Sequence, residues 1–184
     1  MLLARSSKIL QHTGSRLSKS SICRQVHIEK RLEELGLILP TAPAPRANYN
    51  NVCHTPPNIL FVSGHLPITN EGELLTGVVS GENPGGKSIE DAKYAARLTA
   101  LNILATLKRV LGDLDNVEQV VKIFGIVNST NDFKHQHLVM DGCSDLMMEV
   151  FGEKVGYHAR SAIGTNTLPL DVSVEIEAIV AIKK

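Results

Sequence analysis

The last 27 residues constrain the fold more than any other part of the chain. Along residues 172–182 apolar side chains occupy every second position, which gives a β-strand one apolar face. The residues before Pro169 have the pattern of a second strand, so we expect a proline turn between the two. One guanidinium, from Arg160, and two carboxylates, from Glu175 and Glu177, would then lie on neighbouring strands.

The chemistry of this charged group depends on how the strands pair. In a hairpin centred near Pro169, Arg160 lies roughly opposite Glu177, with Glu175 one diagonal step away. One interpretation is a cross-strand ion pair, which at a protein surface stabilises by about 0–1 kcal/mol. The other is a ligand site. Alternating acids on a strand are more often a solvated face, so we assign proton or water chemistry to Glu175 alone.

The preceding sequence alternates between helix and strand signals. Residues 28–37 predict a short amphipathic helix that ends near Gly36, and three prolines then predict an extended connector. An apolar run at 59–65 lies between prolines and predicts a strand, and residues 74–79 predict the next one.

Two longer helices are expected in the second half of the chain. Ser88 and Asp91 have the spacing of a capping box, and the helix that they begin should end at Gly112. Residues 117–128 predict a strand that is apolar on both sides, and residues 133–151 predict the second helix. This order of elements is typical of an α+β fold in which two helices pack on one face of a mixed sheet. The other apolar face remains uncovered, which predicts self-association.

The first 27 residues differ in composition from the rest. They are rich in serine and arginine, contain no acidic residue, and have no apolar run long enough for a secretory signal or a membrane span. We interpret residues 1–27 as a mitochondrial transit peptide, which predicts a matrix protein. The alternative is a disordered basic arm or RNA-binding tail on a cytoplasmic protein. Residues 28–46 would then be the N-terminal helix and proline-rich connector, and 47–184 the domain.

The chain contains, in this order, the motifs Phe61-Val-Ser-Gly-His-Leu-Pro67, Asn131-Asp-Phe133, Ala159-Arg-Ser161 with Leu168-Pro169, and Val174-Glu-Ile-Glu177. Together they resemble the YjgF/UK114-type reactive-intermediate deaminase (RidA) superfamily, in its divergent endoribonuclease or chorismate-mutase-like branch. The resemblance covers about residues 47–184 and implies a chorismate-mutase-like fold that assembles as a homotrimer, with a ligand cleft between adjacent subunits and no cofactor.

The resemblance also implies roles for individual residues. Arg160 would bind a substrate carboxylate, for which a planar, permanently charged guanidinium is well suited. Glu175 would position or activate the attacking water. The other residues that would line the substrate site are Ser63, Gly64 and Ala162 through their backbone, His137 on the second helix, and Tyr49 at the entrance from the neighbouring subunit.

The function that the resemblance implies is hydrolysis of reactive enamines and imines, such as 2-aminoacrylate, to a 2-oxo acid and ammonia. One alternative is a regulatory trimer that binds carboxylates in the same cleft without turnover. Another is an RNA-cleaving protein. Residues 28–184 hold 14 basic and 19 acidic side chains, a net charge of about −5, so they lack the basic surface that phosphate binding normally requires. We therefore expect a small-molecule carboxylate as the partner, and neither nucleic acid nor membrane.

A metal site is not expected. His135 and His137 are two residues apart on the predicted helix, about 200° around its axis, so they cannot both ligate one ion from the same face.

Overall fold

The computed structural model describes residues 27–45, 47–81 and 84–184. The segment interpreted as a transit peptide therefore lies outside the described residues, apart from His27. The described chain forms one mixed five-stranded sheet in the order β1-β2-β5-β3-β4, in which β3 and β4 are parallel and all other neighbours antiparallel. The strands are β1 (Val52–Thr55), β2 (Ile59–His65), β3 (Val117–Asn128), β4 (Ala159–Thr165) and β5 (Val174–Ile182).

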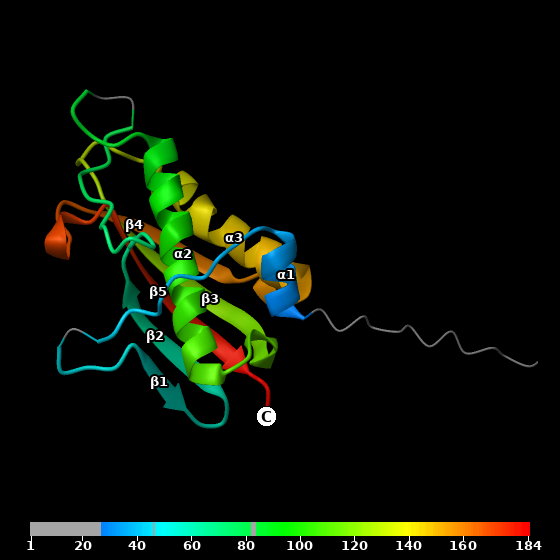
Figure 1. Ribbon diagram of the computed structural model, residues 1–184. Coiled ribbons are helices and arrows are strands. Elements are labelled where there is room, and N and C mark those ends of the chain that lie inside the picture. Colours follow the sequence, from blue (N-terminus) through cyan, green and yellow to red (C-terminus); the bar gives the residue numbers. More distant parts are fainter. Residues whose placement is uncertain (1–26, 46, 82–83) are drawn as a thin grey trace, which may run out of the picture.

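The helices all lie on one face of this sheet (Figure 1). The two long ones, α2 (Ile89–Leu111) and α3 (Gln136–Gly156), pack against each other across it, and the short α1 (Ile28–Glu34) packs against α3. Two 3-10 turns, Leu114–Asn116 and Pro169–Asp171, complete the described elements. The expected α+β architecture, a mixed sheet with helices on one face, is confirmed.

The start of α2 has the geometry that its sequence predicts. The backbone N–H of Asp91 donates to the Ser88 hydroxyl at 3.1 Å, and the Ser88 N–H donates to the Asp91 carboxylate at 3.3 Å, which is a complete capping box. Burial holds the helix in place, because a fully buried leucine such as Leu104 contributes about 1.5–3 kcal/mol. The helix ends before Gly112, whose φ of 75° lies in the left-handed region that favours glycine.

The expected terminal hairpin is wrong. Strand β5 lies between β2 and β3, and β4 lies on the far side of β3. Alternation of side chains fixes the face that a strand buries but not its partner. The chain leaves the end of β3, runs back through α3 and enters β4, and such a helical crossover returns a strand parallel to the first. Arg160 therefore pairs with Ile123 of β3, and Phe124 lies between Ser161 and Glu177.

Two shorter segments also differ from expectation. Residues 74–79 form only isolated bridges to other segments instead of a strand, and the chain turns there through Gly77 at a φ of 108°. The edge strand β1 was not predicted. It is four residues long, and its three exposed residues give it no apolar pattern.

The face of the sheet opposite the helices is partly apolar, as the sequence predicts. Phe61 of β2 pairs with Ile179 of β5, and Ile163 of β4 pairs with Ile126 of β3. Phe61 is 47% exposed and Ile163 is 46% exposed, which is unusual for large apolar side chains on a sheet. We refer to this surface of the sheet as the open face. Self-association through it stays a prediction.

Candidate functional site

Glu175 lies on the open face, next to a position where the chain has no side chain. Its neighbours Val174 and Ile176 are fully buried toward the helices, so Glu175 points the other way. A Cβ atom at Gly64 would lie 1.9 Å from Oε1 of Glu175, so only glycine at this position leaves room for the carboxylate. Burial raises the pKa of the Glu175 carboxyl, and repulsion from Glu177 raises it further. This group can accept a proton more readily than an ordinary glutamate.

A cavity of about 250 Å³ opens beside this carboxylate. The proline-rich connector forms one wall, where the Asn51 side chain donates to the Pro43 carbonyl at 2.6 Å. Leu170 forms part of another wall and has a φ of 59°, a conformation that a leucine rarely adopts. The structure thus brings Tyr49, Gly64 and Glu175 to one cavity. The lining residues are Pro43, Ala44, Tyr49, Asn51, Gly64, His65, Leu66, Ile68, Pro169, Leu170 and Glu175.

The histidine beneath this cavity is a structural group. His65 is 3% exposed, its Nδ1 lies 2.6 Å from the Ser63 carbonyl, and its Nε2 lies 2.8 Å from the Thr106 hydroxyl. Burial lowers the pKa of this imidazole. A neutral His65 donates from Nδ1 and accepts at Nε2, so both of its contacts are satisfied.

Arg160 lies on the edge strand β4, on the side of the sheet that carries the helices. Its Nη1 donates to Oδ1 of Asp141 at 2.9 Å and to Oγ of Ser144 at 3.0 Å, both on α3. Ser144 also lies 3.1 Å from Nε2 of His158, whose Nδ1 is 2.6 Å from the Gly156 carbonyl. Four side chains from α3 and the start of β4 therefore form one hydrogen-bonded chain, and the Arg160 side chain is 25% exposed.

Two further predicted residues lie along the same edge. His137 is exposed and stands one helical turn before Asp141, on the side of α3 that carries Ser144 another turn on. Ala162 is half-buried and lies two residues after Arg160 on β4, so the two share a face of the strand. We call the group of Arg160, Asp141, Ser144, His158, His137 and Ala162 the arginine half-site. We call the cavity at Glu175 the glutamate half-site.

The predicted site residues do not meet within one chain. The register pairs Arg160 with Ile123 and Glu175 with Ile126, and Ile123 is fully buried beneath the helices. Because residues an odd number apart on a strand point to opposite faces, Arg160 and Glu175 lie on opposite faces of the sheet with β3 between them. Completing the site from both halves requires a second copy of the chain.

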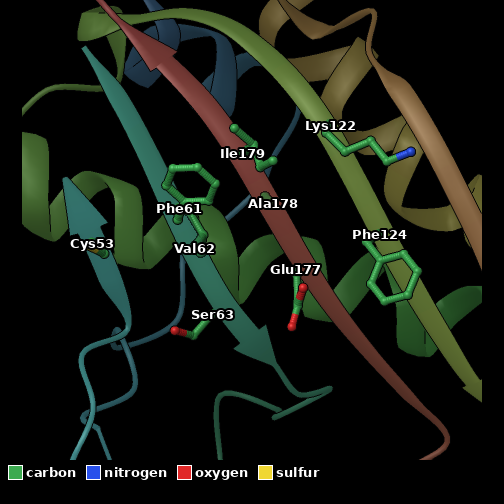
Figure 2. Close-up of a pocket in the computed structure, with 9 residues that line it drawn as sticks. All are labelled: Cys53, Phe61, Val62, Ser63, Lys122, Phe124, Glu177, Ala178 and Ile179. Carbon is green, nitrogen blue, oxygen red and sulfur yellow. The ribbon is translucent and has the colours of Figure 1, made fainter. Parts of the chain in front are cut away.

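Ser63, the remaining predicted residue, faces a different cavity. This cavity of about 430 Å³ lies on the open face and is lined by side chains from β1, β2, β5 and β3, including Phe61, Phe124 and Glu177 (Figure 2). Lys122 reaches toward β4 and donates to the Ser161 hydroxyl at 2.7 Å. Ser63 itself donates to the Asn50 carbonyl at 2.8 Å, which fixes the chain just after Tyr49.

One cluster of carboxylates within the described residues has the spacing of metal ligands. Oxygens of Glu29, Asp113 and Asp115 lie within 4.8 Å of one another. Protein groups already occupy them, however. Glu29 pairs with Lys108 and accepts the Leu114 N–H at 2.9 Å. Oδ1 of Asp115 accepts the Ile28 N–H at 2.9 Å, and its Oδ2 lies 2.8 Å from Nδ1 of His27. The cluster ties α1 to the turn that follows α2.

Three members of the arginine half-site were not predicted as site residues from the sequence. Asp141 and Ser144 are three residues apart on a helix and so share a face, but the sequence does not say that this face meets Arg160. His158 opens the terminal segment, but no sequence pattern indicates that it meets Ser144.

The fold and the two half-sites define a chorismate-mutase-like α+β protein, in which a mixed sheet carries helices on one face. The chain belongs to the family described as "YjgF/chorismate mutase-like, putative endoribonuclease", which matches residues 29–180.

Individual relatives agree with this assignment. Protein TCP17 of Trypanosoma cruzi is 39% identical over 161 residues, which cover 87% of this chain and 97% of that protein. The crystal structure of Atu1372 from Agrobacterium tumefaciens, a protein of unknown function, is 43% identical and has a TM-score of 0.74, covering 85% of this chain and 92% of its own. A "putative endoribonuclease" from Shewanella oneidensis is 29% identical with a TM-score of 0.78, covering 85% of this chain and all of its own.

None of the helices in the described ranges has the length and apolar character that crossing a bilayer requires.

Proposed function

We propose that the protein hydrolyses reactive enamines and imines that carry a carboxylate, such as 2-aminoacrylate, to a 2-oxo acid and ammonia. The observation that carries this proposal is the orientation of Arg160. Both of its contacts within the described chain, Asp141 and Ser144, are made by Nη1. Nε and Nη2 are therefore left for the parallel pair of hydrogen bonds that a carboxylate accepts.

Hydrolysis also needs a group that holds the attacking water, and the glutamate half-site would supply it. A substrate whose carboxylate is fixed by Arg160 presents its carbon–nitrogen double bond beyond the guanidinium. Glu175 of a neighbouring copy would hold the attacking water there, and the raised pKa of its carboxyl suits a group that exchanges protons. Tyr49 stands 51% exposed at the mouth of the same cavity, where it can close over the ligand.

The assembly that we propose is a homotrimer. The arginine half-site lies on the helix side of the edge strand β4, and the glutamate half-site lies on the open face at β2 and the central strand β5. A head-to-tail contact would place one copy's arginine half-site beside the next copy's glutamate half-site, and such contacts generate a ring when the rotation closes. The exposed Phe61 and Ile163 on the open face support burial against other copies. We also propose that residues 1–27 direct the protein to the mitochondrial matrix, on the basis of their composition alone.

The test is release of ammonia and 2-oxo acid when the full chain meets freshly generated 2-aminoacrylate. We expect wild-type protein to accelerate release over the spontaneous reaction, and Arg160→Ala to abolish the acceleration while keeping its fold. Arg97→Ala is the matched control, because Arg97 also forms an ion pair with α3, through Glu149 at 2.7 Å, but lies outside both half-sites. Background rates with wild-type protein would exclude the deaminase. Thermal stabilisation by 2-oxo acids in that case would favour carboxylate binding without turnover.

A further inference from the structure

Ser144 connects the carboxylate-binding arginine to a histidine. Its hydroxyl oxygen lies 3.0 Å from Nη1 of Arg160 and 3.1 Å from Nε2 of His158. Ser144 and His158 are both partly exposed, so they stand at the surface of the arginine half-site and are not part of the closed core.

The partners of these groups fix the direction of each hydrogen bond. The Gly156 carbonyl can only accept, so Nδ1 of His158 carries a hydrogen and donates to it at 2.6 Å. The unprotonated Nε2 must then accept, and the Ser144 hydroxyl donates to it. The guanidinium of Arg160 can only donate, so it donates to the Ser144 oxygen. Ser144 thus directs its single proton to His158 and keeps one lone pair for a further partner.

The surroundings keep His158 ready to accept this proton. Burial lowers the pKa of His158 and the positive charge of Arg160 lowers it further, against an opposing effect of the hydrogen bond to Gly156, so the surroundings favour the neutral imidazole. Burial raises the pKa of the adjacent Cys143 thiol to about 12, which leaves it protonated and inert. Among the charged groups on α3 and β3, Asp141 pairs with Arg160, Asp145 with Lys93, and Lys122 donates to Ser161.

We propose that Ser144 is a catalytic residue that exchanges a proton with the substrate, and that His158 acts through it as the store for that proton. This inference rests on the proposed imine hydrolysis, and it assigns the proton transfer to groups on the same chain as Arg160. Glu175 from the neighbouring copy then holds the water.

The steps balance as follows. The oxygen of water bonds to the carbon of the protonated imine, and the electron pair of the C=N double bond moves to nitrogen. One proton of that water passes to the Ser144 oxygen while the Ser144 proton passes to Nε2 of His158. The same path in reverse then delivers a proton to the amine nitrogen. The C–N bond breaks with its electrons on nitrogen, ammonia leaves, and the remaining hydroxyl proton goes to solvent as the C=O bond forms.

The decisive variants are His158→Gln and Ser144→Ala in the full chain. Glutamine can still accept the Ser144 hydrogen bond but cannot store a proton. Because general acid–base catalysis contributes about 10²–10⁴-fold, we expect kcat on 2-aminoacrylate to fall about 100-fold or more in both variants, with KM within about twofold of wild type. Ser144→Thr keeps the hydroxyl and should retain most of the rate. His54→Gln, an exposed histidine on β1, is the matched control.

The pH profile separates proton transfer from a scaffolding role. Wild-type kcat should fall on the acidic side, below the ordinary range of a histidine, as His158 in the enzyme–substrate complex becomes protonated and can no longer accept a proton. The residual rate of His158→Gln should lack that dependence. An unchanged kcat in His158→Gln, or an effect confined to KM, would overturn the inference, because the pair would then only hold Arg160 in place.

The outcomes also distinguish the two proposals. If wild type turns over and Arg160→Ala does not, but His158→Gln keeps the wild-type kcat and pH profile, only the proton-transfer pair is wrong. If wild type shows no turnover at all, the proposed function and this inference both fall. Melting temperature and oligomer size are measured for each variant. If Ser144→Ala fails to fold, His158→Gln and Ser144→Thr still decide the question.

Discussion

Arg160 and Glu175 lie on opposite faces of one sheet, with β3 between their strands. No rotamer change can bring these side chains together, since the sheet itself separates them. The two residues that the family resemblance joins in one site can act together only across a subunit boundary.

Subunit complementation follows from this separation. Arg160→Ala and Glu175→Gln should each be inactive as pure proteins. When the two are coexpressed and assemble at random, one boundary in about four combines an intact arginine half-site with an intact glutamate half-site, so about a quarter of wild-type activity should return. Mixing the two proteins after purification, without subunit exchange, is the control. No recovery in mixed assemblies would mean that Arg160 and Glu175 do not share a site across a subunit boundary.

Assembly should depend on the open face. Phe61→Asp introduces a charge where a 47% exposed phenylalanine pairs with Ile179. Burying an unpaired carboxylate is costly, so we expect the variant to remain folded but dissociate, with the activity lost along with the oligomer. Light scattering coupled to gel filtration measures the mass. Thr55→Asp, at an exposed position on the edge strand β1, tests whether any charge on the sheet has the same effect.

Gly64→Ala should act through Glu175. The added Cβ would lie 1.9 Å from Oε1 of Glu175, so the carboxylate must move, at a cost of about 1–3 kcal/mol in the free energy of unfolding. Activity should fall with it. Glu175→Ala in the same chain removes the obstacle, so a double-mutant cycle by chemical denaturation should show the cost largely relieved. Additive effects would mean that the strain lies elsewhere.

Glu175→Gln should stabilise the protein at neutral pH. The pKa of Glu175 is raised in the folded state, mainly by burial and further by Glu177, so the folded protein holds this proton more tightly than the unfolded chain does. Stability is therefore lost as pH rises from the unfolded pKa of about 4.3 through the folded pKa. We expect the variant to melt at a higher temperature than wild type at pH 7. In acid, where Glu175 of the wild type is protonated in both the folded and the unfolded state, the two proteins should melt at the same temperature. A lower melting temperature at pH 7 would contradict this.

Much of the fold could be predicted because its signals are local. The bounds of β3 and the capping box at Ser88 depend on neighbouring residues alone, and the structure confirms both. The partner of β4 could not be read from side-chain alternation, which is identical for a strand beside β5 and one beside β3. The helix between β3 and β4 carried that information, because a crossover of this length returns a strand in the parallel sense.

The site was predictable only as far as the resemblance extends. Tyr49, Gly64 and Glu175 do share a cavity, whereas Ser63 faces the larger cavity that Phe61, Phe124 and Glu177 line. The hydrogen-bonded chain from Asp141 through Ser144 to His158 depends on which face of α3 meets β4, and that is a property of packing, which no spacing in the sequence encodes.

The carboxylate of Asp115 contacts the first two residues of the described chain, His27 and Ile28. One of its oxygens accepts the Ile28 N–H, and the other contacts the His27 ring. A protease that trims the chain up to His27 leaves both of these contacts to Asp115 in place. A cut after His27 removes only the His27 contact to Asp115, because Glu29 still pairs with Lys108 and accepts the Leu114 N–H. If a mitochondrial peptidase removes residues 1–26, Asp115 and Glu29 still hold the start of the described fold against the turn after α2.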